Sequence, residues 1–599
     1  MAKSDKYFDA DPVILYRVVA PLAVGTLIIG FWGFWVYESR SNPGIPPDPL
    51  TVLYHTSQLL IGHGAHLEHK IPLILHLGRI LGIAFIFSIG LAAFFLFFRQ
   101  EIMLYRLRFK RRKNHVVICG LGDLGLRLAK TARKKGLLVV GIEKKEANSS
   151  LEQARKSGIL VFEGDATDSS LLKKARAGSA KYVVACCAQD ETNIAIASRL
   201  AGFMKTSKRN EPLVCRLLLN NDDLRKMLID NFWKNVRNLP VNFQVNYRDL
   251  DYHRVVARKC LNDFPMDFKP VMHETIDKVH IVVIGFGKMG ENILLQAARQ
   301  GHFANTTGCY DKLKVTLMGR NVISRYHDFR NRYDMIDRIC EVTCINSNNH
   351  NKAEILKNEL VTFFFCFEKD NDSAADDHRN IEAGIHLLKN NTAREIQILV
   401  FQSTNTGLSA LFPSEPEKDN TFPLLGSFGM IEDIFTWDLI IHDIQDDLAK
   451  NFHECYLETN GKGKKSKNRQ ESDKWENQSE DFQESNRQVA DHLAVKLRAI
   501  GCQYRKRSML LKSEKEIKEE DIDILSRMEH KRYCAERWIA GWKYGDKKSE
   551  EKKLNPSLVC WDELKDDVKK YDIDQVRAII PTLRKFGYGV YKNGESEIQ

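Results

Sequence analysis

The chain opens with two long apolar stretches and then changes to short apolar runs that alternate with amphipathic, helix-like segments. Residues 13–37 and 71–98 are almost entirely apolar. Each stretch exceeds the roughly 20 residues that a helix needs to cross the hydrocarbon core of a bilayer. A signal peptide does not account for the first stretch, because it is long and a second apolar stretch follows. The pattern predicts two transmembrane helices.

Positive charge gathers directly after the second apolar stretch. The run RLRFKRRK covers residues 106–113, whereas the loop between the two stretches holds few cations. The positive-inside rule therefore places both termini in the cytoplasm and the chain in the cell (inner) membrane. The whole chain of 599 residues has a formal net charge of +11. Since the basic run follows an apolar stretch, it suits a membrane surface better than nucleic acid, and we expect no nucleic-acid partner.

The segment between the apolar stretches, residues 38–70, has its own pattern. It opens with turn-forming residues (SNPGIPPDP), and LTVLYHTSQLLI then places apolar residues at helical spacing. This pattern predicts a short re-entrant helix. A Gly-x-Gly follows it, and the candidate pore-loop residues are Ile61, Gly62, His63 and Gly64.

Two spans that enclose a short helix and a Gly-x-Gly resemble the layout of two-span potassium channels. In such filters backbone carbonyls replace the water around the ion, and glycines permit the unusual dihedral angles. The sequence departs from that family because Leu60 stands where potassium filters carry threonine, His63 replaces tyrosine, and no Asp follows Gly64. A selective filter, a pore of other or weak selectivity, and a plain extracellular turn are therefore three alternatives.

A glycine-rich turn follows the first apolar strand of the cytoplasmic part, at residues 115–119. Its glycines, spaced Gly-x-Gly-x-x-Gly, are Gly120, Gly122 and Gly125. In this fingerprint the first glycine makes a tight turn, the second admits a pyrophosphate, and the third packs helix on strand. The helix starts near Asp123, with its N-terminus toward the phosphates, and Glu143 ends the next strand, where an acid accepts from ribose hydroxyls. The segment predicts a nucleotide site; the alternative is a Rossmann scaffold with an empty crevice.

The next strand–helix repeats carry motifs of a known family. GDAT at 164–167 follows one strand, and Asp-x-x-Asn at 190–193 follows the next. From about 114 to 203 the chain resembles the RCK (TrkA-type) regulatory domain of potassium channels and transporters. The resemblance implies binding of NAD, ATP, ADP, another nucleotide or calcium without catalytic turnover, and it places Asp165 and Thr167 near the adenine half. A helix N-terminal cap is the other role open to Asp165.

A second copy of the glycine pattern begins at Val279, and its three glycines are Gly285, Gly287 and Gly290. Its second strand ends at Gly319 and Arg320 instead of an acid. Arg320 suits an extra phosphate, or else the crevice is empty. Ligand binding and a structural or gating role are therefore both open for this copy. RCK units pair in their family, and two units per subunit in a tetramer would make an eight-membered ring.

The C-terminal part begins with a polar stretch at 460–481, which predicts a flexible linker or long loop, and continues with a helical pattern at 486–501. From about 484 to 592 the chain resembles the RyR domain, the repeat first seen in ryanodine receptors and also found alone in bacterial proteins. Tyr533 departs from the bacterial versions, which usually have Trp. The motifs that carry the resemblance are EHKR at 529–532, GWKYG at 541–545 and PSLV at 556–559.

This RyR-like region offers side chains suited to a nucleotide. Aromatic faces beside Arg and His suit a stacked base with a phosphate, and the resemblance implies sensing of nucleotide-derived signals. The alternative is that the tryptophans belong to the core and the charges form surface ion pairs. The candidate residues are Glu529, His530, Arg532, Trp538, Trp542 and Tyr544.

The sequence shows no catalytic constellation and no set of metal ligands. No Cys-x-x-Cys pair occurs among the 13 cysteines, and nothing in the chain resembles the substrate domain that a dehydrogenase needs. We therefore predict a protein that is not an enzyme, has no metal site, and keeps its cysteines reduced in a cytosolic body.

Together the patterns predict a multidomain protein: two transmembrane helices with a candidate re-entrant loop, two α/β Rossmann-like RCK domains, and a mainly helical C-terminal RyR domain. The predicted divisions are 1–113 for the membrane part and basic linker, 114–265 and 266–455 for the two RCK domains, 456–484 for a charged linker, and 485–599 for the RyR domain.

The leading hypothesis is a nucleotide-gated membrane ion channel or membrane effector, with antiviral defence suggested by family association alone. We expect NAD or another adenine nucleotide as the ligand, the lipid bilayer as the surroundings, and a homo-oligomer, by resemblance a tetramer. The alternatives are a membrane-tethered nucleotide sensor without a pore and an NAD-dependent enzyme.

Overall fold

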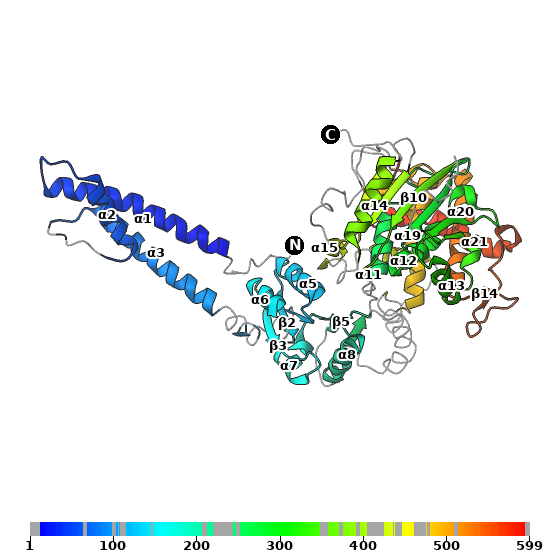
Figure 1. Cartoon of the computed structure of the whole chain (residues 1–599), viewed down its shortest axis with the longest axis horizontal. Coiled ribbons are helices and arrows are strands. Elements are labelled where there is room, and N and C mark those ends of the chain that lie inside the picture. The colour runs from blue at the N-terminus through cyan, green and yellow to red at the C-terminus, as the bar shows by residue number, and fades with distance from the viewer. Residues whose placement is uncertain are drawn as a thin grey trace. The chain divides into compact units, whose positions relative to one another are not determined.

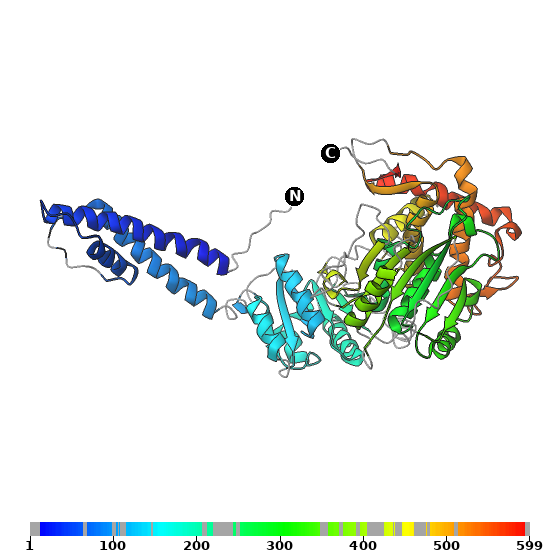
Figure 2. The same ribbon diagram turned by 45° about the horizontal axis from the view of Figure 1, so that its top comes forward.

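The computed structural model divides the chain into two compact units, each described by itself (Figures 1 and 2). Unit 1 holds Met1–Cys215 and Asn238–Val245, and unit 2 holds Arg216–Arg237 and Asn246–Gln599. The structure describes residues 12–63, 67, 69–98, 104–105, 107, 115–144, 148–205, 213–219, 243–246, 252–347, 358–369, 375–390, 396–403, 424–434, 436–437, 446–459, 475, 478, 480–507 and 513–593.

Two long helices form the N-terminal part of unit 1: α1 covers Pro12–Ser41 and α3 covers Leu73–Phe97. They pack side by side, as both ribbon views show (Figures 1 and 2). Within them, Val19–Ser41 and Leu73–Leu91 are long and apolar enough to cross a membrane. The two predicted apolar stretches are therefore helices of membrane-spanning length.

A short helix, α2 (Pro49–Leu60), lies between these two in the sequence. Asp48 caps its N-terminus, since the carboxylate accepts hydrogen bonds from the backbone N–H groups of Leu50 and Thr51 at 3.4 and 3.0 Å. The helix predicted from LTVLYHTSQLLI is confirmed. It packs on α1 and α3 around a small buried cluster of Phe34, Tyr37, Val52, Leu59 and Leu75.

The rest of unit 1 contains a six-stranded sheet in the order β3-β2-β1-β4-β5-β6. Because β1 pairs in parallel with both β2 and β4, the order of strand addition reverses beside β1. Open α/β sheets bind ligands at such a switch point. The strands are β1 (His115–Cys119), β2 (Leu138–Glu143), β3 (Leu160–Glu163), β4 (Tyr182–Ala185), β5 (Leu213–Leu217) and β6 (Phe243–Asn246). The helices are α5 (Asp123–Lys134), α6 (Asn148–Lys156), α7 (Ser169–Lys174), η1 (Ala177–Ser179) and α8 (Asp190–Lys205).

Unit 2 repeats this topology with the order β12-β11-β10-β7-β8-β9, in which every neighbouring pair is parallel. Near-continuous apolar runs, such as residues 361–365, form strands buried on both faces. The strands are β7 (Lys278–Ile284), β8 (Leu313–Met318), β9 (Cys340–Ile345), β10 (Glu359–Phe365), β11 (Ile396–Phe401) and β12 (Leu424–Phe428). The helices are α11 (Tyr252–Asp263), α12 (Lys288–Gln300), η3 (Ala304–Thr306), α13 (Val322–Arg332), η4 (Ile336–Arg338), α14 (Asp377–Asn390) and α15 (Ile431–Ile434). The predicted pair of Rossmann-like domains is confirmed.

The C-terminal part of unit 2 is mainly helical, and its helices α19 and α20 pack against α12 of the second α/β domain. The helix predicted at 486–501 is confirmed over 486–499 as part of α19, whereas residues 460–474 of the predicted linker lie outside the described residues. The elements are α17 (Asp447–Thr459), α19 (Glu480–Ala499), β13 (Cys502–Lys506), α20 (Glu519–Ile539), β14 (Lys543–Tyr544), β15 (Leu554–Asn555), η9 (Trp561–Glu563), α21 (Asp566–Arg577), α22 (Ile579–Lys585) and β16 (Tyr588–Lys592).

Candidate functional site

The loop after α2 carries the candidate pore residues. Ile61 is the C-cap of α2, and Gly62 follows with a φ of +78°, a conformation that favours glycine. A Cβ on Gly62 would lie 3.1 Å from the side chain of Ile86 on α3. His63 is exposed, and Gly64 lies outside the described residues. The predicted turn therefore runs close to the second long helix.

The first glycine turn closes against the end of β4. Gly120 has a φ of +93°, and a Cβ there would meet the carbonyl oxygen of Cys186 at 2.8 Å. A Cβ on Gly125 would overlap the carbonyl oxygen of Gly120. Both positions therefore exclude a side chain, and α5 can start directly against β1, which is the role such glycines have in dinucleotide-binding folds.

Gly122 has a different environment. It is the N-cap of α5, and a Cβ on it would have no described atom within 4 Å. Asp123, which is exposed, begins the helix. The first-turn N–H groups of this 12-residue helix thus border space that the described side chains leave open. Phosphate is a group that helix N-termini of this kind bind.

Glu143 ends β2 beside this turn. Its carboxylate accepts hydrogen bonds from the backbone N–H of Leu121, in the glycine turn, and from that of Lys144 at 2.8 Å. In this structure Glu143 therefore ties the turn to β2. The same strand end is where a dinucleotide-binding fold places the acid that accepts from ribose hydroxyls.

Asp165 and Thr167 follow β3, the neighbour of β2 in the sheet. Asp165 Oδ1 accepts hydrogen bonds from the N–H and the hydroxyl of Thr167 at 2.8 and 2.7 Å. These bonds lower the pKa of Asp165, and Lys144 Nζ lies 3.6 Å from its Oδ2. The alternative of Asp165 as a helix cap is wrong, because Asp168 caps α7 by accepting from the Ser170 N–H at 2.7 Å.

Asn193, outside the predicted set, fixes the chain where it leaves β4. This fully buried side chain accepts from the N–H of Cys187 and donates to its carbonyl oxygen, both at 2.9 Å. The chain is thereby held where it passes the glycine turn. The motif at 190–193 contained this asparagine, but a sequence pattern alone could not name its partner six residues earlier.

The second glycine turn has the same construction. Gly285 has a φ of +95°, and a Cβ there would meet the carbonyl oxygen of Cys366 at 2.6 Å. A Cβ on Gly290 would meet the carbonyl oxygen of Gly285 at 2.6 Å. Asn380 holds the N–H and the carbonyl oxygen of Phe367 at 2.8 and 2.9 Å, as Asn193 does in the first copy.

The two copies differ at the N-terminus of the helix that follows. The Glu368 carboxylate accepts hydrogen bonds from the N–H groups of Met289 and Lys288 at 2.5 and 3.2 Å. It also stands where a Cβ on Gly287 would lie. Burial raises the pKa of Glu368, and the hydrogen bonds to α12 act in the opposite direction. Arg320, the other candidate of this copy, is exposed after β8.

The charged candidates of the RyR-like region lie inside it. Glu529 and Arg532, both on α20, are 0% and 2% exposed. Glu529 accepts from Arg532 at 3.0 and 2.8 Å and from Lys496 of α19, and Arg532 also donates to Glu536 at 2.7 Å. Burial raises the pKa of Glu529, but the two cations outweigh it and lower the pKa to about 2. These charges therefore neutralise one another and join α20 to α19.

The aromatic candidates differ in exposure. Trp542 is buried in a small core cluster with Cys534. Trp538 is half-buried, and the Arg338 guanidinium of η4 lies 5.8 Å from its ring centroid. Tyr544 is 53% exposed. The three aromatic candidates therefore differ in exposure, and Trp538 packs against the cluster that holds Trp542.

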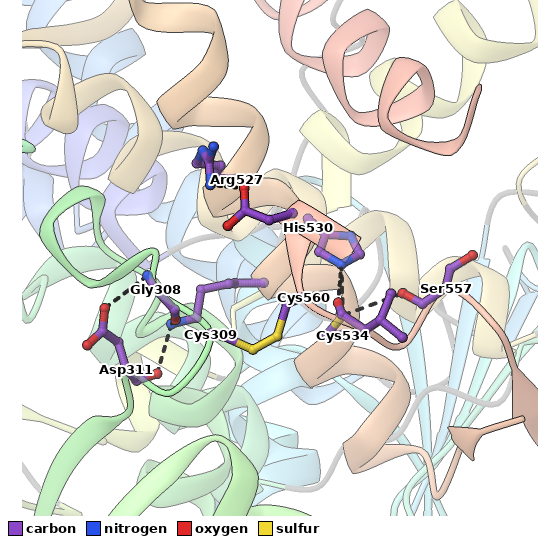
Figure 3. The surroundings of a disulfide bond; sticks show 11 residues. Gly308, Cys309, Asp311, Arg527, His530, Cys534, Ser557 and Cys560 are labelled. Carbon is purple, nitrogen blue, oxygen red and sulfur yellow. Dashed lines mark hydrogen bonds and ion pairs between the residues drawn. A yellow bond between two sulfur atoms is a disulfide. The ribbon is translucent and has the colours of Figure 1, made fainter. Parts of the chain in front are cut away.

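A disulfide connects the RyR-like region to the second α/β domain within unit 2 (Figure 3), and the half-buried ammonium group of Lys531 adds a second contact. Cys309 is bonded to Cys560, with their Cα atoms 5.4 Å apart and 251 residues between them in the sequence. The prediction of reduced cysteines is wrong for this pair, while ten other described cysteines are free thiols. Near Cys309, Lys531 of α20 donates from its Nζ to the carbonyl oxygens of Thr306, Gly308 and Asp311 at 2.5, 3.1 and 2.8 Å.

Comparison with known families identifies two parts of the chain. Residues 116–215, which contain the first glycine turn, match the TrkA-N domain, and residues 513–592, which contain α20, match the RyR domain. The chain contains a TrkA-N domain and a RyR domain. The resemblances to the RCK (TrkA-type) domain and to the RyR domain are thereby confirmed.

Two curated relatives match short segments. Potassium channel protein 1 of Methanocaldococcus jannaschii is 33% identical over 113 residues, which are 18% of this chain and 33% of that protein. An uncharacterized protein of Methanothermus fervidus is 30% identical over 114 residues, which are 19% of this chain and 18% of that protein. The chain thus spans a third or less of these relatives.

Two solved structures of GsuK cover more of the chain at low similarity. The structure bound to ADP is 14% identical, with a TM-score of 0.32, and the match covers 72% of this chain and 99% of that one. The channel bound to NAD is 13% identical, with a TM-score of 0.32, and the match covers 74% and 86%.

Proposed function

We propose that the chain is a subunit of a nucleotide-responsive ion channel of the cell membrane, and that an adenine nucleotide such as ADP or NAD binds at the first glycine turn. The observation that carries this proposal is the open approach to the α5 N-terminus beside Gly122, at the switch point of the sheet. The match of residues 116–215 to the TrkA-N domain, the two apolar helices, and the relative named as a potassium channel protein support it.

In this proposal α1 and α3 lie in the bilayer, both termini are cytoplasmic, and four identical subunits surround a pore. A nucleotide opens or closes the pore only through its different affinity for two states of the α/β domain. A tenfold difference in affinity between the two states supplies about 1.4 kcal/mol per site, and the free energies from the four sites of a tetramer add. The protein turns nothing over, so NADH and ADP are recovered unchanged.

Gly122→Ala tests the nucleotide site in the purified full chain. The added Cβ has no described neighbour within 4 Å, so we expect an unchanged melting temperature. Because the second glycine of the fingerprint admits the pyrophosphate, we expect ADP affinity to fall about tenfold or more. The readouts are calorimetric titration with ADP and nucleotide-dependent current in planar bilayers.

Gly202→Ala is the matched control, since a Cβ at this exposed position of α8 also has no described neighbour within 4 Å. It should bind ADP as the wild type does. Wild-type ADP affinity in Gly122→Ala would contradict the proposed site.

A membrane-tethered nucleotide sensor without a pore is the second candidate. It is favoured by the end of α2 and the loop that follows, where Leu60 and His63 depart from the threonine and tyrosine of potassium filters. This candidate predicts normal ADP binding together with bilayers that stay silent at every nucleotide concentration. Nucleotide-dependent current in the wild type would exclude it.

A further inference from the structure

The internal repeat makes the two glycine turns comparable residue by residue. In the first copy Asn193 holds the backbone of Cys187, and in the second Asn380 holds that of Phe367. The next residue along the chain is therefore in the same position in both copies. It is alanine at 188 and glutamate at 368.

In the second copy this glutamate makes the contacts that a phosphate would make. Its two carboxylate oxygens accept from the first-turn N–H groups of α12, those of Lys288 and Met289. It also fills the space over Gly287, whereas a Cβ on the counterpart Gly122 would have no described neighbour within 4 Å. A carboxylate and a phosphate compete for the same donors and for the same positive end of the helix dipole.

We propose that the residue directly after the backbone segment held by Asn193 or Asn380 decides which copy binds a nucleotide. Glu368 closes the second crevice from within, and Ala188 leaves the first one open to the phosphates. This inference rests on the proposed function, because it names the determinant of that same nucleotide site. The second copy thus has a structural role without a nucleotide, and each chain binds a single adenine nucleotide.

The test exchanges the two residues in the full chain. Wild type should bind one ADP per chain in an equilibrium titration. Ala188→Glu should weaken this binding by at least about tenfold, because its carboxylate can reach the α5 N–H groups as Glu368 reaches those of α12. Glu368→Ala should raise the number of ADP sites to two, and a photoreactive azido-ADP should then label peptides of the second domain.

Two further measurements separate folding and charge effects from site closure. Ser198→Glu adds the same charge at an exposed position within α8 and should bind ADP like wild type. Melting temperatures report whether each variant is folded. If Glu368→Ala does not fold, Ala188→Glu alone tests the inference. This variant should fold, since residue 188 is exposed.

Wild-type affinity in Ala188→Glu, or a folded Glu368→Ala that stays at one site, would overturn the inference. Label in the second domain of the wild type would overturn it as well. The wild type could bind no ADP while Glu368→Ala binds one. This result would contradict the proposed function at the first glycine turn but would support the role of Glu368 in closing the second crevice.

Discussion

His530 is a buried histidine whose neighbours stabilise its positively charged form. Its Nε2 contacts the Val559 carbonyl oxygen at 2.8 Å, and its Nδ1 lies 3.4 Å from the carboxylate of Asp572 on α21. Burial lowers the pKa of His530, but the hydrogen bonds to Asp572 and Cys534 outweigh it and raise the pKa to about 10. The folded protein therefore keeps this imidazole protonated at neutral pH.

The contribution of His530 to stability should fall as the pH rises. An unfolded histidine releases its proton near pH 6.5, whereas the folded one keeps it to about 10, so the contribution is complete below pH 6.5 and is lost as the pH rises through 10. Between pH 7 and 8 the loss approaches about 1.4 kcal/mol per pH unit. His530→Gln should remove this slope in thermal unfolding of the full chain.

The comparison of slopes is made between pH 7 and 8 because, at higher pH, the deprotonation of Lys531 changes the stability in the opposite direction. Burial lowers the pKa of Lys531 to about 8, so its effect on stability begins there. His386→Gln, which removes an exposed histidine of α14, serves as the control and should keep the wild-type slope. Equal slopes in His530→Gln and wild type would show that the imidazole is neutral in the folded state.

At the scale of elements, α1 and α3 approach each other through glycines. A Cβ on Gly78 of α3 would lie 2.9 Å from the Cα of Gly30, and one on Gly33 of α1 would lie 2.7 Å from the Cα of Leu75. Small residues permit such close approach of helices in membranes, where packing drives association. The two helices therefore depend on glycine at their crossing.

Gly78→Leu should force α1 and α3 apart. Overpacking of this kind costs about 1–3 kcal/mol, and we expect a lower melting temperature of the protein in detergent and loss of any channel current. Gly90→Leu is the control, because it adds the same apolar volume to α3 at a position where a Cβ has no described neighbour within 4 Å. Equal melting temperatures for the two variants would refute close packing at Gly78.

Local patterns predicted the elements well, because strands, helices and glycine turns are encoded by residues that are near one another in the chain. The apolar stretches, α2, both glycine units and α19 could all be read from the sequence. Contacts across long separations could not. Glu368 lies 79 residues beyond the Met289 N–H that it accepts from, and Cys309 bonds to a cysteine 251 residues away. The contact of Glu368 with the start of α12 and the disulfide therefore emerge only in three dimensions.

At the scale of the whole molecule, the C-terminal helices are integrated into unit 2 by ion pairs whose carboxylate side chains are buried and whose guanidinium groups are partly exposed. Arg258 of α11 donates to Asp491 of α19 at 2.7 and 2.8 Å and to Asp446 at 2.7 Å. Arg498 of α19 donates to Asp267 at 2.8 and 2.7 Å. A ligand-induced shift in the RyR region would therefore act directly on the second α/β domain, which has no nucleotide of its own in our proposal.

This integration predicts that unit 2 unfolds as one cooperative body. Arg258→Met leaves the Asp491 carboxylate, whose side chain is 6% exposed, without its guanidinium. Removing one partner of a buried pair costs about 3–5 kcal/mol, so calorimetry of the full chain should show the unit 2 transition broadening or splitting at lower temperature. Arg577→Ala breaks an exposed pair with Glu519, worth about 0–1 kcal/mol, and should leave the transition unchanged. If both variants melt alike, the two domains are only neighbours, and a signal received by one has no direct mechanical route to the other.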